Sequence, residues 1–127
     1  MTISICRRFS FAYAHKLPEH GGLCKNLHGH NAVLEIEISG KVNEKTGMVA
    51  DFKQLKDLVN LRVINILDHS YLNDVVAFNF PSHCPTAENL LIWIVQELQA
   101  GLMFTDCFLC RVRFWETETC YAEWREV

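Results

Sequence analysis

NAVLEIEISGKV, residues 31–42, alternates apolar and polar side chains along most of its length. Leu34, Ile36 and Ile38 all lie at even positions, that is, they share one parity, and two glutamates stand between them. Successive side chains of a strand point to opposite faces of a sheet, so this pattern predicts a strand with one buried and one polar face. A sheet built on this strand has one face for a core and one face for charged side chains.

Two further segments predict strands of the same kind. The aromatic and β-branched residues near the C-terminus predict a hairpin from about Cys107 to Trp115 and from about Cys120 to Arg125. Residues 2–14 carry large apolar side chains at odd positions, and His15 continues their parity. These odd positions are Ile3, Ile5, Phe9, Phe11 and Tyr13.

Two helices are expected between the strand pairs. Asp51 followed by Gln54 resembles a capping box, and Pro85-Thr86 opens a second helix that Gly101 ends. Their apolar stripes are Phe52, Leu55, Leu58, Val59 and Val63, then Leu90, Leu91, Ile94, Val95 and Leu98. The element order predicts an α+β fold in a single domain over residues 1–127. Its four-stranded antiparallel sheet would have both helices on one face.

Composition narrows the class of protein. The chain has 127 residues, 50% of them apolar, and a net charge of −3, so no general basic field favours nucleic acid. The N-terminal residues lack the apolar run of a signal peptide, and NLLIWIVQEL is too short to span a bilayer. We therefore expect a cytoplasmic protein that binds neither nucleic acid nor membrane. Its six cysteines are expected to be reduced thiols.

Three histidines are predicted to form a metal site. His28 and His30 are two residues apart, so in an extended chain they point the same way, toward the apolar face of the following strand. His15 lies on the apolar parity of the first strand. The three imidazoles are expected to converge at one end of a paired hairpin. Zinc held by three histidines keeps a fourth position open for water or substrate, so zinc is the predicted ion.

Cys24 stands close to these histidines in LCKNLHGHN, residues 23–31, and two interpretations are open. As a fourth ligand, the thiol would close the site and make it structural. As a thiol near a divalent cation, it could lose its proton readily and act as a base.

Two downstream segments favour a catalytic site over a structural one. Asp68 and His69 are adjacent in LDHSYLND and could polarise a thiol or pass protons. Glu116 ends the face that carries Val112 and Phe114, together with Phe108 and Cys110. A buried carboxylate needs partners, and a guanidine-like ligand edge is a suitable one.

The chain resembles the 6-pyruvoyl-tetrahydropterin synthase superfamily, and most of all the bacterial branch that makes 6-carboxytetrahydropterin for queuosine biosynthesis. The motifs are FSFAYAH, CKNLHGHN, GMVADF, LDHSYLN, PTAEN and WETET, which run nearly from end to end. The resemblance implies the tunnelling fold. In that fold, trimers close a barrel of strands, two trimers stack into a homohexamer, and sites form between subunits.

The resemblance also implies a role for each candidate residue. His15, His28 and His30 would bind zinc, and Cys24 would be the catalytic base. Asp68 and His69 would form a proton relay. Glu116 would anchor the pterin, and Thr86 would be a second contact to its ring. The implied reaction converts 7,8-dihydroneopterin triphosphate and water to 6-carboxy-5,6,7,8-tetrahydropterin, acetaldehyde and triphosphate. Elimination of triphosphate to 6-pyruvoyl-tetrahydropterin is the alternative reaction. A non-catalytic binding module with a four-ligand zinc site is a third possibility.

Overall fold

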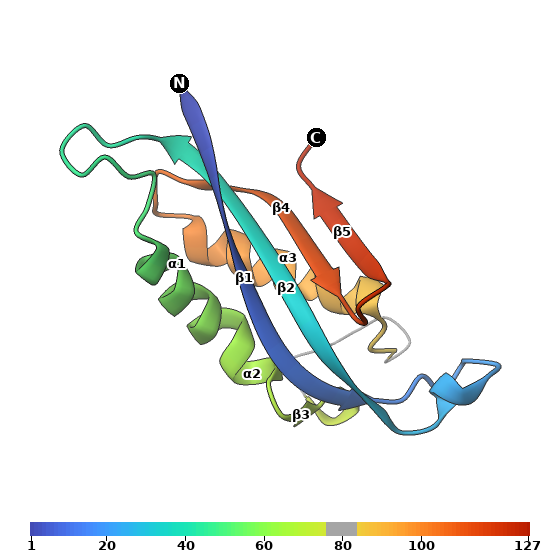
Figure 1. The fold of residues 1–127 in the computed structure, drawn as a ribbon. Helices are drawn as coiled ribbons and strands as arrows, with labels where there is room; N and C mark the ends of the chain where they lie inside the picture. The colour runs from blue at the N-terminus through green and yellow to red at the C-terminus, as the bar shows by residue number, and fades with distance from the viewer. Residues whose placement is uncertain (76–83) are drawn as a thin grey trace.

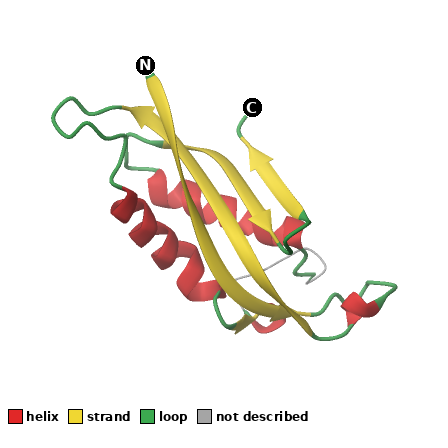
Figure 2. Ribbon diagram, in the orientation of Figure 1, coloured by secondary structure: helices red, strands yellow, loops and turns green. Residues whose placement is uncertain are grey.

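The computed structural model describes residues 1–75 and 84–127, and residues 76–83 lie outside this description. In the described part, one sheet lies against a layer of helices on one of its faces (Figures 1 and 2). The strands are β1 (Thr2–His15), β2 (His28–Lys41), β3 (Ser70–Tyr71), β4 (Phe108–Trp115) and β5 (Tyr121–Arg125). The helices are α1 (Phe52–Val59), α2 (Asn65–Leu67) and α3 (Ala87–Leu102), with a π-helical segment, Asn60–Ile64, joining α1 to α2. The predicted α+β class is confirmed.

The sheet has five strands in the order β3-β1-β2-β4-β5, so the predicted count of four is one short. β3 runs parallel to β1 and pairs with Tyr13 and Ala14, which makes the sheet mixed rather than wholly antiparallel. A strand of two residues has no alternation that could be recognised in the sequence. It is held at the edge because Asp68 and His69 bond to the main chain of Ala12.

The core lies between β2 and the helices. Leu34, Ile36 and Ile38 are at most 1% exposed, as their alternation predicted. The helices contribute the other side of the core, which includes Leu55, Val59, Val63, Leu67, Leu90, Ile94 and Leu98. Phe52 was expected in this stripe but is 50% exposed, because it is the first residue of α1.

A β-bulge in β4 changes one predicted face. Residues 37–38 of β2 pair with Arg111 and Leu109, so Cys110 is an extra residue of β4. An extra residue inverts the parity on its far side. Phe108, predicted to be buried, is therefore 57% exposed, and Leu109 is 4% exposed in its place. After the bulge the predicted parity holds to the end of the strand.

The helices begin at the predicted caps. The Asp51 carboxylate accepts from the backbone N–H of Lys53, and the Thr86 hydroxyl accepts from that of Asn89. Gly101 lies within α3 instead of ending it, and Leu102 is the last residue of the helix. A Cβ at Gly101 would stand 2.7 Å from a methyl carbon of Leu58, so the close approach of α1 favours glycine there. Over the described ranges, no helix is both long and apolar enough to cross a membrane.

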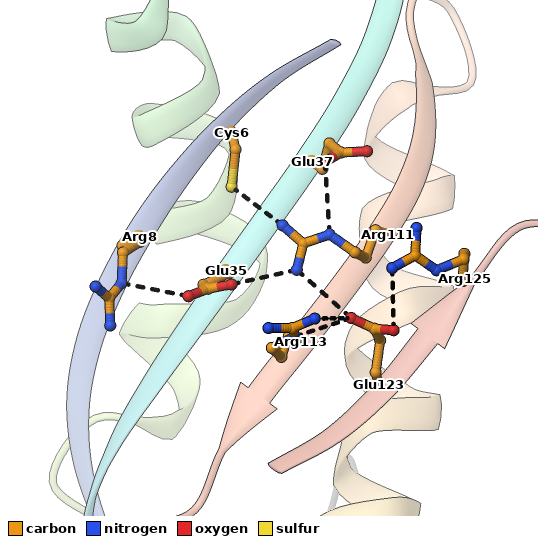
Figure 3. A network of polar contacts seen from close by, with 8 residues as sticks. All are labelled: Cys6, Arg8, Glu35, Glu37, Arg111, Arg113, Glu123 and Arg125. Carbon is orange, nitrogen blue, oxygen red and sulfur yellow. Dashed lines mark hydrogen bonds and ion pairs between the residues drawn. The ribbon is translucent and has the colours of Figure 1, made fainter. Parts of the chain in front are cut away.

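The helix-free face of the sheet is charged, as the two glutamates of β2 predicted (Figure 3). The Arg111 guanidinium is at the centre of this network, with N–O distances of 3.2 to 3.5 Å to Glu35, Glu37 and Glu123. The network also includes Cys6, Arg8, Arg113 and Arg125. Charges of this face are thus paired with one another across four strands.

The cysteines are free thiols, as expected. Cys107 Sγ contacts the carbonyl of Val49, and Cys110 Sγ contacts that of Phe108. The C-x-x-C pair therefore packs against two different parts of the main chain.

Truncation of the central strand should destabilise the protein. Ile36→Ala removes a fully buried side chain, so the free energy of unfolding should fall by about 2–5 kcal/mol. Denaturant titration at fixed protein concentration measures this change. Leu61→Ala, at a position that is 69% exposed, is the matched control and should change it by less than about 0.5 kcal/mol. Equal effects of the two variants would contradict the assignment of the core.

Candidate active site

Three histidines converge where β1 ends and β2 begins. His15 lies directly opposite His28 in the antiparallel ladder, and His30 lies opposite Tyr13. One ligand nitrogen of each histidine lies within 4.8 Å of the others, and this group could hold a metal ion. His15 is buried and the other two are half-buried. The predicted convergence of the imidazoles is confirmed.

Main-chain carbonyls orient two of the rings. His15 Nδ1 lies 2.8 Å from the carbonyl oxygen of Pro85, and His28 Nδ1 lies 2.8 Å from that of Asn26. Since a carbonyl oxygen accepts only, each Nδ1 donates a proton and each Nε2 carries its lone pair. Such support is usual for histidines that bind metal.

The spacing of one pair of nitrogens fits a tetrahedral ion. Nε2 of His15 and Nε2 of His30 are 3.2 Å apart. Two nitrogens that each lie about 2.0–2.1 Å from a tetrahedral zinc are separated by about 3.3 Å. The donor set of the cluster, and the spacing of this pair, therefore suit zinc.

Burial favours the neutral form of two of these imidazoles, those of His15 and His30. Desolvation lowers the pKa of His15, and the hydrogen bond to Pro85 and the charge of Glu116 offset part of this effect. Desolvation also lowers the pKa of His30, again against the charge of Glu116. Neutral imidazole is the form that ligates metal, so the site is prepared for an ion near neutral pH.

Glu116 comes to the same place from β4, which lies on the far side of β2 from β1. It directly follows β4, and its Oε1 lies 3.6 Å from Nε2 of both His15 and His30. The same oxygen accepts a hydrogen bond from the hydroxyl of Tyr13 at 3.0 Å. A carboxylate, a phenol and the imidazoles thus surround one small space.

The residue that precedes the N-cap of α3 also reaches the site. Thr86 is the N-cap of this helix, and its neighbour Pro85 supplies the carbonyl that orients His15. The Thr86 hydroxyl is tied to its own helix through Asn89. The structure thus places Thr86 one residue from a direct contact to the histidine cluster.

Cys24 lies in the connection between β1 and β2. It belongs to a short 3-10 helix, Leu23–Lys25, and its carbonyl accepts from the N–H of Leu17 at 2.8 Å. The Cys24 thiol is half-buried and is not a member of the three-histidine group. The group therefore contains nitrogen ligands only.

Asp68 and His69 form a pair on the outer edge of β1. Asp68 Oδ1 lies 3.0 Å from His69 Nδ1 and accepts from the N–H of Ala12. The bond from Ala12 lowers the pKa of Asp68, and His69 lowers it further. His69 has a left-handed backbone, φ 59°, and its side chain is 84% exposed. Within residues 1–75 and 84–127, neither side chain bonds to the histidine cluster.

Sequence reasoning missed three polar contacts at the site. Tyr13 was interpreted as a core residue, although its position on the parity of His15 signals proximity to the cluster. The carbonyls of Asn26 and Pro85 left no signal, because every residue type has a carbonyl.

The comparisons with known proteins agree with this geometry. The sequence model of the family described as 6-pyruvoyl tetrahydropterin synthase matches residues 4–127. The chain belongs to this family. The structure of 6-pyruvoyl tetrahydropterin synthase from Caenorhabditis elegans superposes with a TM-score of 0.86 at 28% identity, covering 100% of this chain and 97% of that one. The expected tunnelling fold of a tetrahydropterin synthase is thus confirmed for the single chain.

Two relatives within the family carry the name of the carboxy branch. The 6-carboxy-5,6,7,8-tetrahydropterin synthase of Haemophilus influenzae is 32% identical over 142 residues, covering 96% of this chain and 98% of that protein. The putative 6-carboxy-5,6,7,8-tetrahydropterin synthase of Archaeoglobus fulgidus is 43% identical over 117 residues, covering 91% and 90%. The chain thus resembles tetrahydropterin synthases over nearly its whole length.

Loss of one imidazole should empty the metal site. Purified protein should carry about one zinc ion per chain, and His30→Ala should lose most of it, because two remaining nitrogens bind zinc far more weakly than three. Metal analysis by mass spectrometry measures the content. His20→Ala is the matched control, since His20 is exposed and lies outside the cluster. Full zinc content in His30→Ala would contradict the assignment.

Proposed function

We propose that this protein is a zinc-dependent 6-carboxy-5,6,7,8-tetrahydropterin synthase. It would convert 7,8-dihydroneopterin triphosphate and water to 6-carboxy-5,6,7,8-tetrahydropterin, acetaldehyde and triphosphate, for queuosine or a related 7-deazapurine. The observation that carries the proposal is a cluster of three histidine nitrogens, two of which lie beside the carboxylate of Glu116, in a chain of this family. Relatives named for the carboxy reaction support the choice of branch.

His15, His28 and His30 are the proposed zinc ligands. Zinc bound there would acidify the side-chain hydroxyls of the substrate and polarise a developing carbonyl. The group holds three nitrogens and no sulfur, which favours an open coordination position over a closed structural site. This supports an enzyme over the zinc-stapled binding module.

Cys24, Asp68 and His69 are the proposed groups for proton transfer. The Cys24 thiolate would take a proton from a side-chain carbon of the substrate. His69, held by Asp68 at 3.0 Å, would carry protons to and from the reacting atoms. Because His69 is exposed on the edge of β1, we propose that it serves the site of a neighbouring copy.

Glu116 is the proposed anchor for the pterin ring. A carboxylate accepts two adjacent N–H groups at once, and a pterin presents such a pair on its guanidine-like edge. Glu116 is 26% exposed, so a ligand can reach it. Thr86, at the start of α3, is proposed to hold the ring beside it.

The free sheet edges support the proposed homohexamer. In the described part, β5 pairs only with β4, and residues 2–12 of β1 pair only with β2. Unpaired strand edges are templates for pairing with another chain. Edge-to-edge pairing of three copies would close a barrel, and two such rings would stack into a hexamer.

The pyruvoyl reaction is the second candidate, because the Caenorhabditis elegans neighbour carries that name. Incubation of zinc-loaded protein with 7,8-dihydroneopterin triphosphate distinguishes the carboxy reaction from the pyruvoyl reaction by their products. Acetaldehyde together with a product of the mass of 6-carboxytetrahydropterin is the expected result. Triphosphate without acetaldehyde would assign the pyruvoyl reaction, and no turnover by zinc-loaded protein would contradict both.

The thiol of Cys24 should be needed for turnover but not for zinc. Cys24→Ala removes the proposed base, so acetaldehyde formation should fall by about 100-fold or more. Its zinc content should equal that of the unmodified protein, since Cys24 lies outside the ligand group. Cys84→Ala, at another half-buried free thiol, is the control. Loss of zinc from Cys24→Ala would make the thiol a ligand and contradict its role as base.

Mixed hexamers should show whether two copies share each site. Cys24→Ala and His69→Ala proteins, each inactive, are refolded together in equal amounts. If His69 acts in a neighbouring copy, about one quarter of the sites regain both groups, and activity returns to about that fraction. A mixture of Cys24→Ala with His28→Ala is the control and should stay inactive, because both groups would serve the same copy's site. No recovery in the first mixture would place His69 in the site of its own chain.

A further inference from the structure

Tyr13 is joined to Glu116 across an intervening strand. Tyr13 lies on β1 and Glu116 follows β4, and β2 separates these two strands in the sheet. The Tyr13 hydroxyl nevertheless donates to Oε1 of Glu116 at 3.0 Å. An ionised carboxylate has no proton to donate, so the phenol is the donor of this bond.

The ring of Tyr13 is held in place by its neighbours. The side chain is 4% exposed and lies between other rings of the same face. Its ring centroid is 5.8 Å from that of Phe11, 6.1 Å from that of Phe114 and 5.1 Å from that of His15. The hydroxyl is therefore a donor in a fixed position, because the packed core leaves the ring little freedom.

Glu116 is less constrained than its partner. It stands after the last residue of β4 and is 26% exposed, and its backbone N–H bonds to the carbonyl of Cys120. Its side chain has three rotatable bonds, and ordering such a side chain during binding costs affinity. Of the contacts to its Oε1, the bond from Tyr13 is the shortest, against 3.6 Å for His15 and His30.

We propose that Tyr13 is a positioning residue for Glu116: its hydroxyl holds the carboxylate in the orientation that accepts the two N–H groups of a pterin. The inference rests on the proposed function, since it takes Glu116 to be the pterin anchor. Each carboxylate oxygen has two lone pairs. Tyr13 uses one lone pair of Oε1, which leaves the other and those of Oε2 for the ligand.

A carboxylate in a fixed orientation would also make the site prefer a pterin over a ring that lacks the 2-amino group. Lumazine has the ring system of a pterin but carries a carbonyl oxygen in place of the 2-amino group. That oxygen would face a carboxylate oxygen that Tyr13 prevents from turning away. A site that hydrogen-bonds a substrate N–H group rejects an analogue that lacks it, because its acceptor is left unpaired. Without the hydroxyl, Glu116 can turn aside, so the preference for pterin over lumazine should fall.

Tyr13→Phe removes the hydroxyl and keeps the ring, so the packing against Phe11 and Phe114 is retained. Fluorescence titration with pterin and with lumazine gives the dissociation constants without catalysis. We expect pterin to bind about tenfold more weakly to Tyr13→Phe, as for loss of a hydrogen bond to a charged group, and lumazine to bind as before. In turnover, KM should rise by about the same factor while kcat changes little. Zinc content and melting temperature are measured on the same samples.

Two further proteins make the test specific. Tyr121→Phe removes the hydroxyl of a half-exposed tyrosine on β5 and should leave both dissociation constants unchanged. In a Glu116→Gln background, Tyr13→Phe should weaken pterin binding by much less than in the unmodified protein, because its effect passes through the carboxylate. Equal weakening in both backgrounds would overturn the inference.

The outcomes separate this inference from the proposed function. If the unmodified protein binds pterin no better than lumazine, the anchor and the inference both fail. If it prefers pterin, and folded Tyr13→Phe keeps that preference, Tyr13 is only a core residue and the anchor stands. A lower melting temperature with unchanged pterin affinity would likewise overturn the positioning role.

Discussion

The register of one hairpin determines where the chemistry can occur. β1 and β2 pair along 14 residues each, and this ladder sets His15 opposite His28 and Tyr13 opposite His30. A shift of one residue would turn every side chain of a strand to the other face and separate the imidazoles. The long apolar face between β2 and the helices opposes such a slip, because it would expose Leu34 and its neighbours to water.

The two faces of the sheet differ in the charged groups that they carry. On the helix-free face, Arg111 is surrounded by carboxylates, so charges of both signs neutralise one another (Figure 3). On the covered face, burial favours the neutral forms of His15 and His30, and the Glu116 carboxylate lies 3.6 Å from Nε2 of each. A neutral nitrogen cluster beside one carboxylate suits a divalent cation and a ligand with N–H groups.

The alternation of side chains along the strands predicted part of the site, and it failed where the alternation is broken or too short to see. The odd positions of β1 and the even positions of β2 correctly predicted that the three imidazoles converge. Parity put Glu116 at the end of the apolar face of β4, and the structure then showed that its carboxylate lies beside the histidines. The same argument gave the wrong face for Phe108, since a bulge at Cys110 breaks the alternation and has no sequence signature. It missed β3, because two residues define no period.

The sequence by itself determined the α+β order of elements, the face on which each strand is buried and the residue types that could bind a metal. These are local properties, since alternation and helix caps depend on neighbours along the chain. Only the tertiary structure decided that the carbonyls of Asn26 and Pro85 orient the imidazoles and that the hydroxyl of Tyr13 reaches Glu116. Those contacts join residues up to 103 positions apart, and their geometry depends on how helices and strands pack rather than on any periodic pattern.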